Sequence, residues 1–224
     1  MPIPETRSCM VNYLTCNGSQ IVKKKGVNPL LPAIVAVAVV AAMFLPSILW
    51  PKGSQSGGGD RSQWAKAIDR PGLPNLHQVS DVLYRGAKPT REGIDELGKM
   101  GVKTIIDLET RYDVGVSDDD ATGTGITVVH IGFDPWHPKE SDVVQFLRVV
   151  TNESRQPLFV HCRHGSDRTG MMCAIYRIAV QGWTKDQAIA EMTHGGFGFH
   201  PMWQDLLYYI RQMDVEKLKA KCGL

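Results

Sequence analysis

The sequence has few cysteines and no excess of charge of either sign. Its 224 residues include five cysteines, and their positions at Cys9, Cys16, Cys162, Cys173 and Cys222 indicate no disulfide framework. Lysine and arginine total 25, and aspartate and glutamate total 23. The resulting net charge of +2 gives no reason to expect a nucleic-acid partner. No internal repeat is present, and the length suits one domain with additional segments.

Charged residues are absent from residues 30–50, which are apolar throughout. As a helix this segment would extend over roughly 30 Å, enough to cross a bilayer. Three lysines, Lys23, Lys24 and Lys25, precede it, and no acidic residue lies between Thr6 and Leu49. By the positive-inside rule, the sequence predicts a single-pass signal anchor with a cytoplasmic N-terminus, and it places the part of the chain after the anchor outside the cytoplasm, in the periplasm of a bacterium. A buried core helix and a cleaved signal peptide fit the segment less well.

The segments on either side differ in composition. Residues 1–29 lack periodicity and are expected to form a disordered tail, whereas residues 51–60 are rich in glycine and are typical of a flexible linker. Strand-like and helix-like segments alternate over residues 61–214, which indicates an α/β domain. Residues 215–224 are expected to be a charged tail.

Hydrophobic periodicity gives the expected elements of the α/β domain. Strands are predicted at 82–85, 103–108, 126–131 and 158–160. Helices are predicted at 91–100, 141–150, 169–181 and 202–213, and a capping box at Thr184 begins another. Trp203, Tyr208 and Tyr209 fall at helical spacing and are expected in the core. We therefore expect a central, mostly parallel sheet of about four or five strands flanked by helices.

The run at 160–170, VHCRHGSDRTG, carries the most chemical information. In it, Cys162 is separated from Arg168 by five residues, between a strand-like and a helix-like segment. A tight loop that leads into a helix N-terminus presents backbone N–H groups that suit a phosphate. The same surroundings favour the thiolate, which is the form of cysteine that attacks phosphorus. Arg168 can bind two phosphate oxygens at once.

The other residues of this loop also have expected roles. Gly165 lets the loop curl, His161 is expected to fix the backbone and add positive field, and Thr169 can donate a hydrogen bond to the departing sulfur. Arg163 and His164 would add positive charge at the mouth of the pocket, unless they are simply solvated. The residues expected to line the phosphate site are His161, Arg163, His164, Gly165, Ser166, Asp167 and Arg168.

This loop resembles the signature loop of the cysteine-dependent dual-specificity and tyrosine phosphatases. Further stretches that are similar to small bacterial periplasmic members lie at 83–89, 174–177, 181–183, 191–192 and 195–198. The similarity extends from about residue 64 to about residue 210. It implies a phosphatase that forms a phosphocysteine on Cys162 and uses no metal or other cofactor.

The resemblance also implies a general acid on a loop before the cysteine. Asp134, which follows the strand predicted at 126–131, is the first candidate. Asp167 is the alternative, because lipid-phosphatase-like bacterial members use an aspartate directly before the arginine; otherwise its carboxylate is a hydrogen-bonding group of the loop. His137 could assist, or be an exposed surface group.

Three functions remain open at this point. The leading hypothesis is a membrane-tethered protein phosphatase that acts on phosphotyrosine, with phosphoserine and phosphothreonine as further candidate substrates. The alternative substrate is a phosphoinositide or inositol polyphosphate, which the basic loop, Asp167 and the apolar segment favour. A silent phosphate-binding module is the third, although the intact Cys162, Arg168 and Thr169 argue against it. The expected partners are therefore a phosphorylated protein or a phosphoinositide, and a membrane through residues 30–50.

Overall fold

The computed structural model describes residues 61–110 and 121–224. These residues belong to one compact unit. The predicted tail at 1–29, signal anchor at 30–50 and linker at 51–60 lie outside the described residues.

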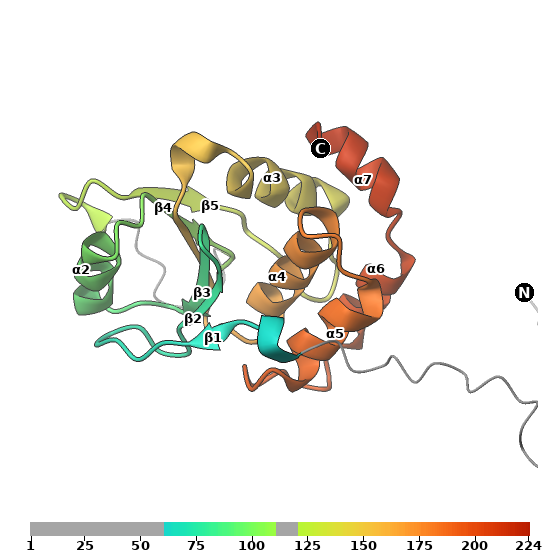
Figure 1. Ribbon diagram of the computed structural model, residues 1–224, viewed down its shortest axis with the longest axis horizontal. Helices are drawn as coiled ribbons and strands as arrows, with labels where there is room; N and C mark the ends of the chain where they lie inside the picture. Colours follow the sequence, from blue (N-terminus) through green and yellow to red (C-terminus); the bar gives the residue numbers. More distant parts are fainter. Residues whose placement is uncertain (1–60, 111–120) are drawn as a thin grey trace, which may run out of the picture. The chain divides into compact units, whose positions relative to one another are not determined.

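A six-stranded mixed sheet forms the centre of the described domain (Figure 1). Its strands, in spatial order, are β1 (Lys66–Ala67), β2 (His77–Ser80), β3 (Leu83–Ala87), β6 (Leu158–Cys162), β4 (Thr104–Asp107) and β5 (Thr127–His130). The last four are parallel to one another, whereas β1 and β2 extend the sheet in antiparallel fashion. The expected count of four or five strands is too low, because β1 has only two residues and β2 has a single buried apolar residue, so neither gives a hydrophobic pattern.

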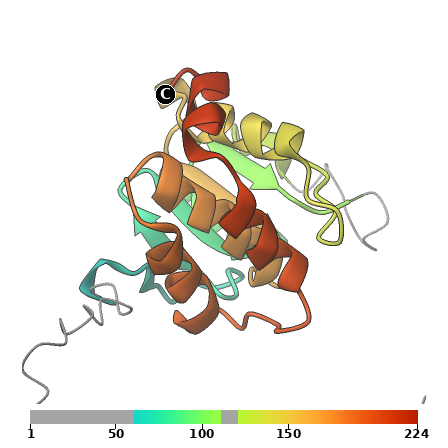
Figure 2. The same ribbon diagram turned by 90° about the vertical axis from the view of Figure 1, so that its right-hand side faces the viewer.

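Helices cover both faces of the sheet (Figure 1). One face is covered by α2 (Arg91–Lys99). The other carries α3 (Glu140–Val150), α4 (Asp167–Ala179), α5 (Lys185–His194), α6 (Gln204–Gln212) and α7 (Val215–Cys222). Figure 2 brings α4 to α7 in front of the sheet. The predicted helices all form, with ends that differ by at most a few residues, and the capping box between Thr184 and Gln187 is confirmed.

The central strand β6 is buried on both faces, and its side chains alternate between two hydrophobic cores. Leu158 and Val160 pack with α3 to α7, whereas Phe159 packs with α2. Because β3 and β4 pair with β6 on its two sides, Cys162 ends the innermost strand of the sheet. The loop that follows therefore lies at the carboxyl edge of the parallel strands, where ligand sites of α/β proteins form.

A buried ion pair between Arg177 and Glu191 joins α4 to α5. Both residues belong to the stretches that resemble the phosphatase family, and the pair gives each of them a structural role. The Arg177 guanidinium donates to both carboxylate oxygens of Glu191, at 2.8 Å and 2.7 Å. Glu191 also accepts a hydrogen bond from the Ala65 amide at 2.6 Å, and Arg177 donates to the Gln63 carbonyl at 3.1 Å. The pair thus fastens the start of the described domain to its helical layer.

Residues 215–224, which were expected to be a charged tail, contain α7 and are part of the domain. Asp214 caps this helix by accepting a hydrogen bond from the Lys217 amide at 3.0 Å. Leu218 is only 2% exposed and packs in the larger core. Lys221 also forms an ion pair with Glu140 of α3 at 2.5 Å. The sequence gives little hydrophobic periodicity for α7, because charged residues are frequent in it and its apolar face contains few residues.

No helix among residues 61–110 and 121–224 is long and apolar enough to span a bilayer. The longest, α4, has 13 residues, compared with the ~20 that a spanning helix requires. This finding overturns the predicted single-pass membrane location and the extracytoplasmic placement derived from it. Residues 30–50, on which that prediction rested, lie outside the described residues.

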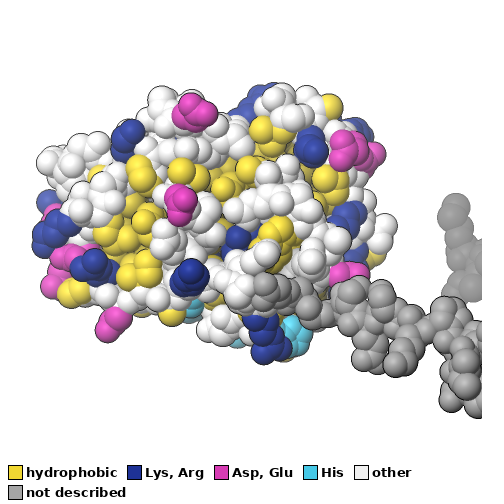
Figure 3. Space-filling view, viewed as in Figure 1, with side chains coloured by type: hydrophobic (Ala, Val, Ile, Leu, Met, Phe, Trp, Pro, Cys, Tyr) yellow, Lys and Arg dark blue, Asp and Glu magenta, His cyan; other side chains and the backbone are white. Residues whose placement is uncertain are grey.

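Charges of both signs are distributed over the face of the molecule that Figure 3 shows. Small groups of apolar side chains lie between them, and neither sign dominates this face. This distribution agrees with the nearly balanced composition of 25 basic and 23 acidic residues.

The place of α7 in the core can be tested by substitution. Leu218→Ala is expected to lower the free energy of unfolding by about 2–5 kcal/mol, because it removes a buried side chain and leaves a cavity. Glu216→Ala is the matched control, since this side chain of the same helix is 85% exposed, and it should change stability little. Urea denaturation followed by circular dichroism gives both values. Equal midpoints for the two variants would contradict the packing of α7.

Candidate active site

Cys162 lies at the base of a cleft at the carboxyl edge of the sheet, and it is 3% exposed. The cleft has a volume of about 880 Å³. Four segments that are far apart in the sequence line it. Their side chains include Thr110 after β4, Asp134, Trp136 and Lys139 from the loop before α3, Cys162, Arg163, His164, Asp167 and Arg168 from the loop and the start of α4, and His200 and Trp203 from the segment before α6. The structure therefore brings the expected nucleophile, cation and acid candidates together.

The tight curl of the loop depends on Gly165. Its φ of +71° lies in the left-handed region, which residues with a Cβ atom rarely adopt. A Cβ atom at this position would also lie 2.4 Å from the carbonyl carbon of Gly86 and 2.5 Å from the amide nitrogen of Ala87. Those atoms belong to β3 and cannot move freely. The expected role of Gly165 in curling the loop therefore has a physical basis in both φ and close packing.

The buried side chain of Arg85 holds the loop from behind. Its Nη2 atom donates to the carbonyl oxygen of Gly165 at 2.7 Å and to that of Ser166 at 3.5 Å. The guanidinium also lies 3.7 Å from the ring centroid of Phe197. Burial lowers the pKa of Arg85, although an arginine stays protonated under these conditions. Carbonyl groups that point to Arg85 do not face a bound phosphate. The sequence placed Arg85 in a family-like stretch but gave it no role.

The segment before α6 is fastened to the same loop. Asn75 Nδ2 donates to the carbonyl oxygens of His164 and Phe197, both at 3.0 Å. Ser166 Oγ donates to the Phe197 carbonyl at 2.7 Å. The side chain of Ser166 is therefore directed to this segment and away from the cleft, in contrast to the expectation that it lines the phosphate site. Only its backbone N–H remains available to a phosphate.

Asp167 is bound on both carboxylate oxygens by one residue, His200. The His200 backbone N–H donates to Oδ1 at 2.8 Å, and its Nδ1 lies 2.8 Å from Oδ2. Both residues line the cleft. These contacts fix the position of His200 beside the start of α4. They support the structural alternative for Asp167, in which its carboxylate is a hydrogen-bonding group of the loop.

Asp134 lines the cleft on a more exposed loop. Its Oδ1 accepts a hydrogen bond from the Trp136 backbone N–H at 2.9 Å, and His137 Nδ1 lies 3.2 Å from its Oδ2. The hydrogen bond from Trp136 lowers the pKa of Asp134, and His137 lowers it further. The loop that carries Asp134 therefore borders the cleft. In this arrangement its carboxyl group favours the ionised form.

His161 and Thr169 lie behind the cleft. Burial lowers the pKa of His161 to about 4, so its ring is neutral near pH 7 and does not add the positive field that we expected. The Thr169 side chain is fully buried, and its hydroxyl has no hydrogen-bond partner in the described part of the chain. Few buried hydroxyl groups in folded proteins lack a hydrogen-bond partner.

The cleft has cationic and aromatic walls. Arg168 Nη1 donates to the Leu108 carbonyl at 3.3 Å, while Arg163 and His164 are exposed at the mouth. The rings of Trp136 and Trp203 are in contact, with centroids 4.5 Å apart and planes inclined at 58° to each other. Trp203 lines the cleft and also packs against the larger core, so the expectation of a core position holds in part. Tyr208, which was also expected in the core, is 65% exposed.

Residues 61–110 and 121–224 contain no group of three His, Cys, Asp or Glu side chains that could hold a metal ion.

The proteins of known sequence that this chain resembles include phosphatases. The family model described as "PTP-NADK: DSP-PTPase phosphatase fused to NAD+ Kinase" matches residues 70–206. The dual specificity protein phosphatase TpbA of Pseudomonas aeruginosa is 34% identical over 190 residues, which cover 83% of this chain and 82% of that protein. An inositol diphosphatase of Arabidopsis thaliana is 28% identical over 151 residues, covering 65% of this chain and 72% of that protein.

Solved structures give the same result. The crystal structure of TpbA from P. aeruginosa is similar with a TM-score of 0.64 at 34% identity, and it covers 74% of this chain and all of that one (100%). A cysteine-to-serine variant of TpbA, crystallised in complex with phosphotyrosine, is similar with a TM-score of 0.63 at 32% identity. The latter match covers 74% of this chain and 99% of that one.

The packing of Gly165 against β3 leads to a test of the loop. Gly165→Ala is expected to lower kcat/KM for an aryl phosphate by about 100-fold or more, because the clash displaces the loop that surrounds the reacting group. Gly182→Ala is the control, since Gly182 has a similar φ of +72° but no atom within 4 Å of the added Cβ. A full rate in Gly165→Ala would show that the loop tolerates the added atom.

Proposed function

Since the chain belongs to the cysteine-dependent dual-specificity phosphatase family, we propose that it hydrolyses phosphotyrosine in proteins, with Cys162 as the nucleophile. The observation that carries this proposal is the cleft, in which Cys162 and Arg168 lie at the base and Trp136 and Trp203 form a wall. Aromatic side chains suit the ring of a phosphotyrosine. The relative TpbA is a dual specificity protein phosphatase, and a variant of it binds phosphotyrosine. Phosphoserine and phosphothreonine are further substrates of the same chemistry.

In the first step, the Cys162 thiolate attacks phosphorus while the bond to the leaving oxygen breaks. The sulfur–phosphorus bond forms a phosphocysteine, and the released oxygen takes a proton from Asp134. Arg168 and the backbone N–H groups of the loop bind the three remaining phosphate oxygens and stabilise their charge in the transition state. Because the Arg85 contacts engage the carbonyls of Gly165 and Ser166, the loop can present N–H groups to those oxygens.

In the second step, water replaces the sulfur. The Asp134 carboxylate accepts a proton from the attacking water, an oxygen–phosphorus bond forms, and the sulfur–phosphorus bond breaks. Inorganic phosphate and the Cys162 thiolate result. The Thr169 hydroxyl donates a hydrogen bond to the departing sulfur, a role supported by its burial and by its lack of another partner in the described residues.

Asp134 is our choice of acid because the competing carboxylate is already engaged. Both oxygens of Asp167 are bound by His200, which leaves Asp167 a positioning role. The lowered pKa of Asp134 belongs to the site without substrate. A bound phosphate dianion is a like charge that disfavours ionisation of a nearby carboxyl group, and it therefore helps Asp134 to carry the proton needed in the first step.

A second candidate substrate is an inositol polyphosphate or phosphoinositide. The cationic side chains of Lys139, Arg163 and Arg168 line the cleft together with His164, and they could bind several phosphate groups. The similarity to an inositol diphosphatase of A. thaliana also favours this candidate. The mechanism would be the same, because only the leaving group differs.

Substitution of the nucleophile tests the mechanism and the substrate together. Cys162→Ser is expected to lower kcat by about 10⁴-fold or more, because a serine hydroxyl stays protonated at the base of the loop. The variant should still bind a phosphotyrosyl peptide in a calorimetric titration, and bind it more tightly than inositol hexakisphosphate. Cys222→Ser, at a half-buried cysteine of α7, is the control. Turnover by Cys162→Ser at the wild-type rate would exclude the mechanism. Tighter binding of inositol hexakisphosphate than of the peptide would favour the second substrate.

The choice between the two carboxylates follows from leaving-group chemistry. Asp134→Asn is expected to lower kcat by about 100-fold or more for phenyl phosphate, a poor leaving group that needs a proton. It should affect an aryl phosphate with a strongly acidic leaving group much less. Asp167→Asn should reduce both rates by the same factor, because it weakens the contact with His200 and leaves the acid in place. The reverse pattern would identify Asp167 as the acid.

A further inference from the structure

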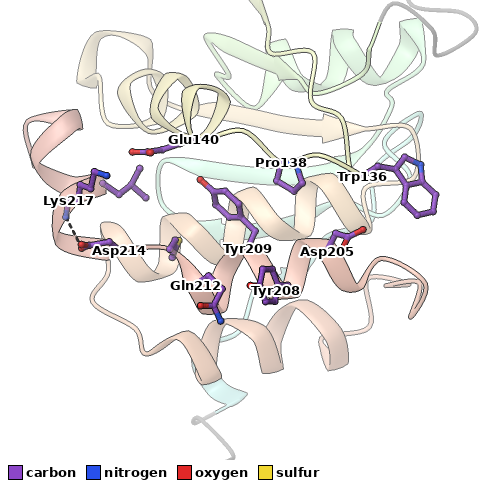
Figure 4. A pocket seen from close by; sticks show the side chains of 11 residues that line it. Trp136, Pro138, Glu140, Asp205, Tyr208, Tyr209, Gln212, Asp214 and Lys217 are labelled. Carbon is purple, nitrogen blue, oxygen red and sulfur yellow. Dashed lines mark hydrogen bonds between the residues drawn. The ribbon is translucent and has the colours of Figure 1, made fainter. Parts of the chain in front are cut away.

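A second cavity, of about 540 Å³, lies beside the catalytic cleft (Figure 4). It is a groove between the loop before α3, one face of α6 and the start of α7. Trp136 lies at one end of the groove, and Asp214 and Lys217 lie at the other (Figure 4). None of the residues that carry the proposed chemistry lines it.

The groove adjoins the catalytic cleft at Trp136, which lines both. This side chain is 51% exposed, and its ring contacts that of Trp203, which lines the cleft. A polypeptide that leaves the cleft over these two rings would enter the groove directly. The arrangement suits an extended substrate that places one residue in the cleft and its neighbours outside it.

Exposed aromatic surface forms much of the groove. Tyr208 is 65% exposed on α6, and the Tyr209 ring lies between Pro138 and Glu140 (Figure 4). Large exposed aromatic side chains at a concave surface are typical of sites that bind a partner. A free small molecule the size of an inositol phosphate has no apolar part to place against them.

The groove is acidic, whereas the catalytic cleft is basic. Its lining includes the carboxylates of Glu140, Asp205 and Asp214 and a single lysine, Lys217. Glu140 is paired with Lys221, but the Asp205 carboxylate has no hydrogen bond or ion pair within the described part of the chain.

Negative charge beside the groove also affects the pKa of Tyr209. Burial raises the pKa of Tyr209 to about 12, and the negative charges of Glu140 and Asp142 contribute in the same direction. Both carboxylates belong to the first turn of α3, which borders the groove. The side chain of Tyr209 therefore stays neutral, and the surrounding charge favours a cation.

We propose that this groove binds the polypeptide that flanks the phosphorylated residue of the substrate, and that it selects flanks with lysine or arginine beside apolar side chains. The inference rests on the proposed function, because it takes a phosphoprotein as the substrate. The phosphate dianion enters the basic cleft, and the cationic flank lies on the acidic groove. Charge of opposite sign at two adjacent sites orients a substrate as well as selecting it.

Two phosphotyrosyl peptides that differ only in lysine or glutamate on both flanks test the proposal. The wild-type protein should hydrolyse the lysine peptide with a kcat/KM at least about fivefold higher at low salt, and the preference should weaken as salt screens the charges. In the double variant Asp205→Asn, Asp214→Asn, the ratio between the peptides should fall at least about threefold. Asparagine still caps α7 at position 214, so the helix is kept.

The ratio is measured within each variant, so a general loss of activity cancels. Asp81→Asn is the matched control, because Asp81 is an exposed carboxylate that lines neither cavity, and it should leave the ratio unchanged. A wild-type protein without charge preference, or a double variant with the wild-type ratio, would overturn the proposal.

Binding to the Cys162→Ser variant separates the groove from the proposed function. If that variant prefers the lysine peptide but the wild-type protein hydrolyses neither peptide, the groove assignment holds and the phosphotyrosine function fails. If both peptides are hydrolysed at equal rates and bound equally, the function holds and the groove assignment fails. If neither peptide is bound or hydrolysed, both are wrong.

Discussion

The catalytic loop depends on one buried cation, the guanidinium of Arg85. This side chain is 1% exposed, and a buried charge is stable only when nearby groups compensate for the loss of water. Its compensating groups are the carbonyl oxygens of Gly165 and Ser166 and the ring of Phe197. Strand β3, the loop after β6 and the segment before α6 therefore assemble around a single side chain. The same contacts direct the loop carbonyls away from the phosphate.

The remaining contacts of the site extend this arrangement outwards. Gly165 lets the loop approach β3, and Asn75 joins the loop to Phe197. Asp167 then fixes His200 at the edge of the cleft. The backbone of the loop is thus held from three directions before substrate binds, as electrostatic stabilisation of a phosphate requires. Asp134 differs from these residues, because it lies on an exposed loop.

The sequence predicted those features that local patterns determine. Runs of β-branched residues placed β4 and β5, and the run at 160–170 placed Cys162 and Arg168 between a strand and a helix. It could not predict contacts between distant segments, such as those of Arg85 with Gly165, 80 residues away, or of Asp167 with His200, 33 residues away. Short or highly charged elements, such as β1 and α7, also lack a periodic signal. The neutral His161 was missed because burial, which lowers its pKa to about 4, is a property of the fold.

The two cavities give the enzyme a division of roles. In the mechanism that we propose, the cleft supplies the chemistry of phosphate hydrolysis. The groove beside it has an opposite charge and an aromatic surface, so it can distinguish between polypeptides that present the same phosphate.

The central claim is the covalent phosphocysteine, and rapid acid quench of the wild-type enzyme with an aryl phosphate tests it most directly. The quenched protein is digested and its peptides are analysed by mass spectrometry. The mechanism predicts a phosphoryl group on the peptide that contains Cys162, formed during the first turnover together with a burst of the aryl product. Product release without any phosphorylated peptide, or a phosphoryl group on another residue, would contradict it.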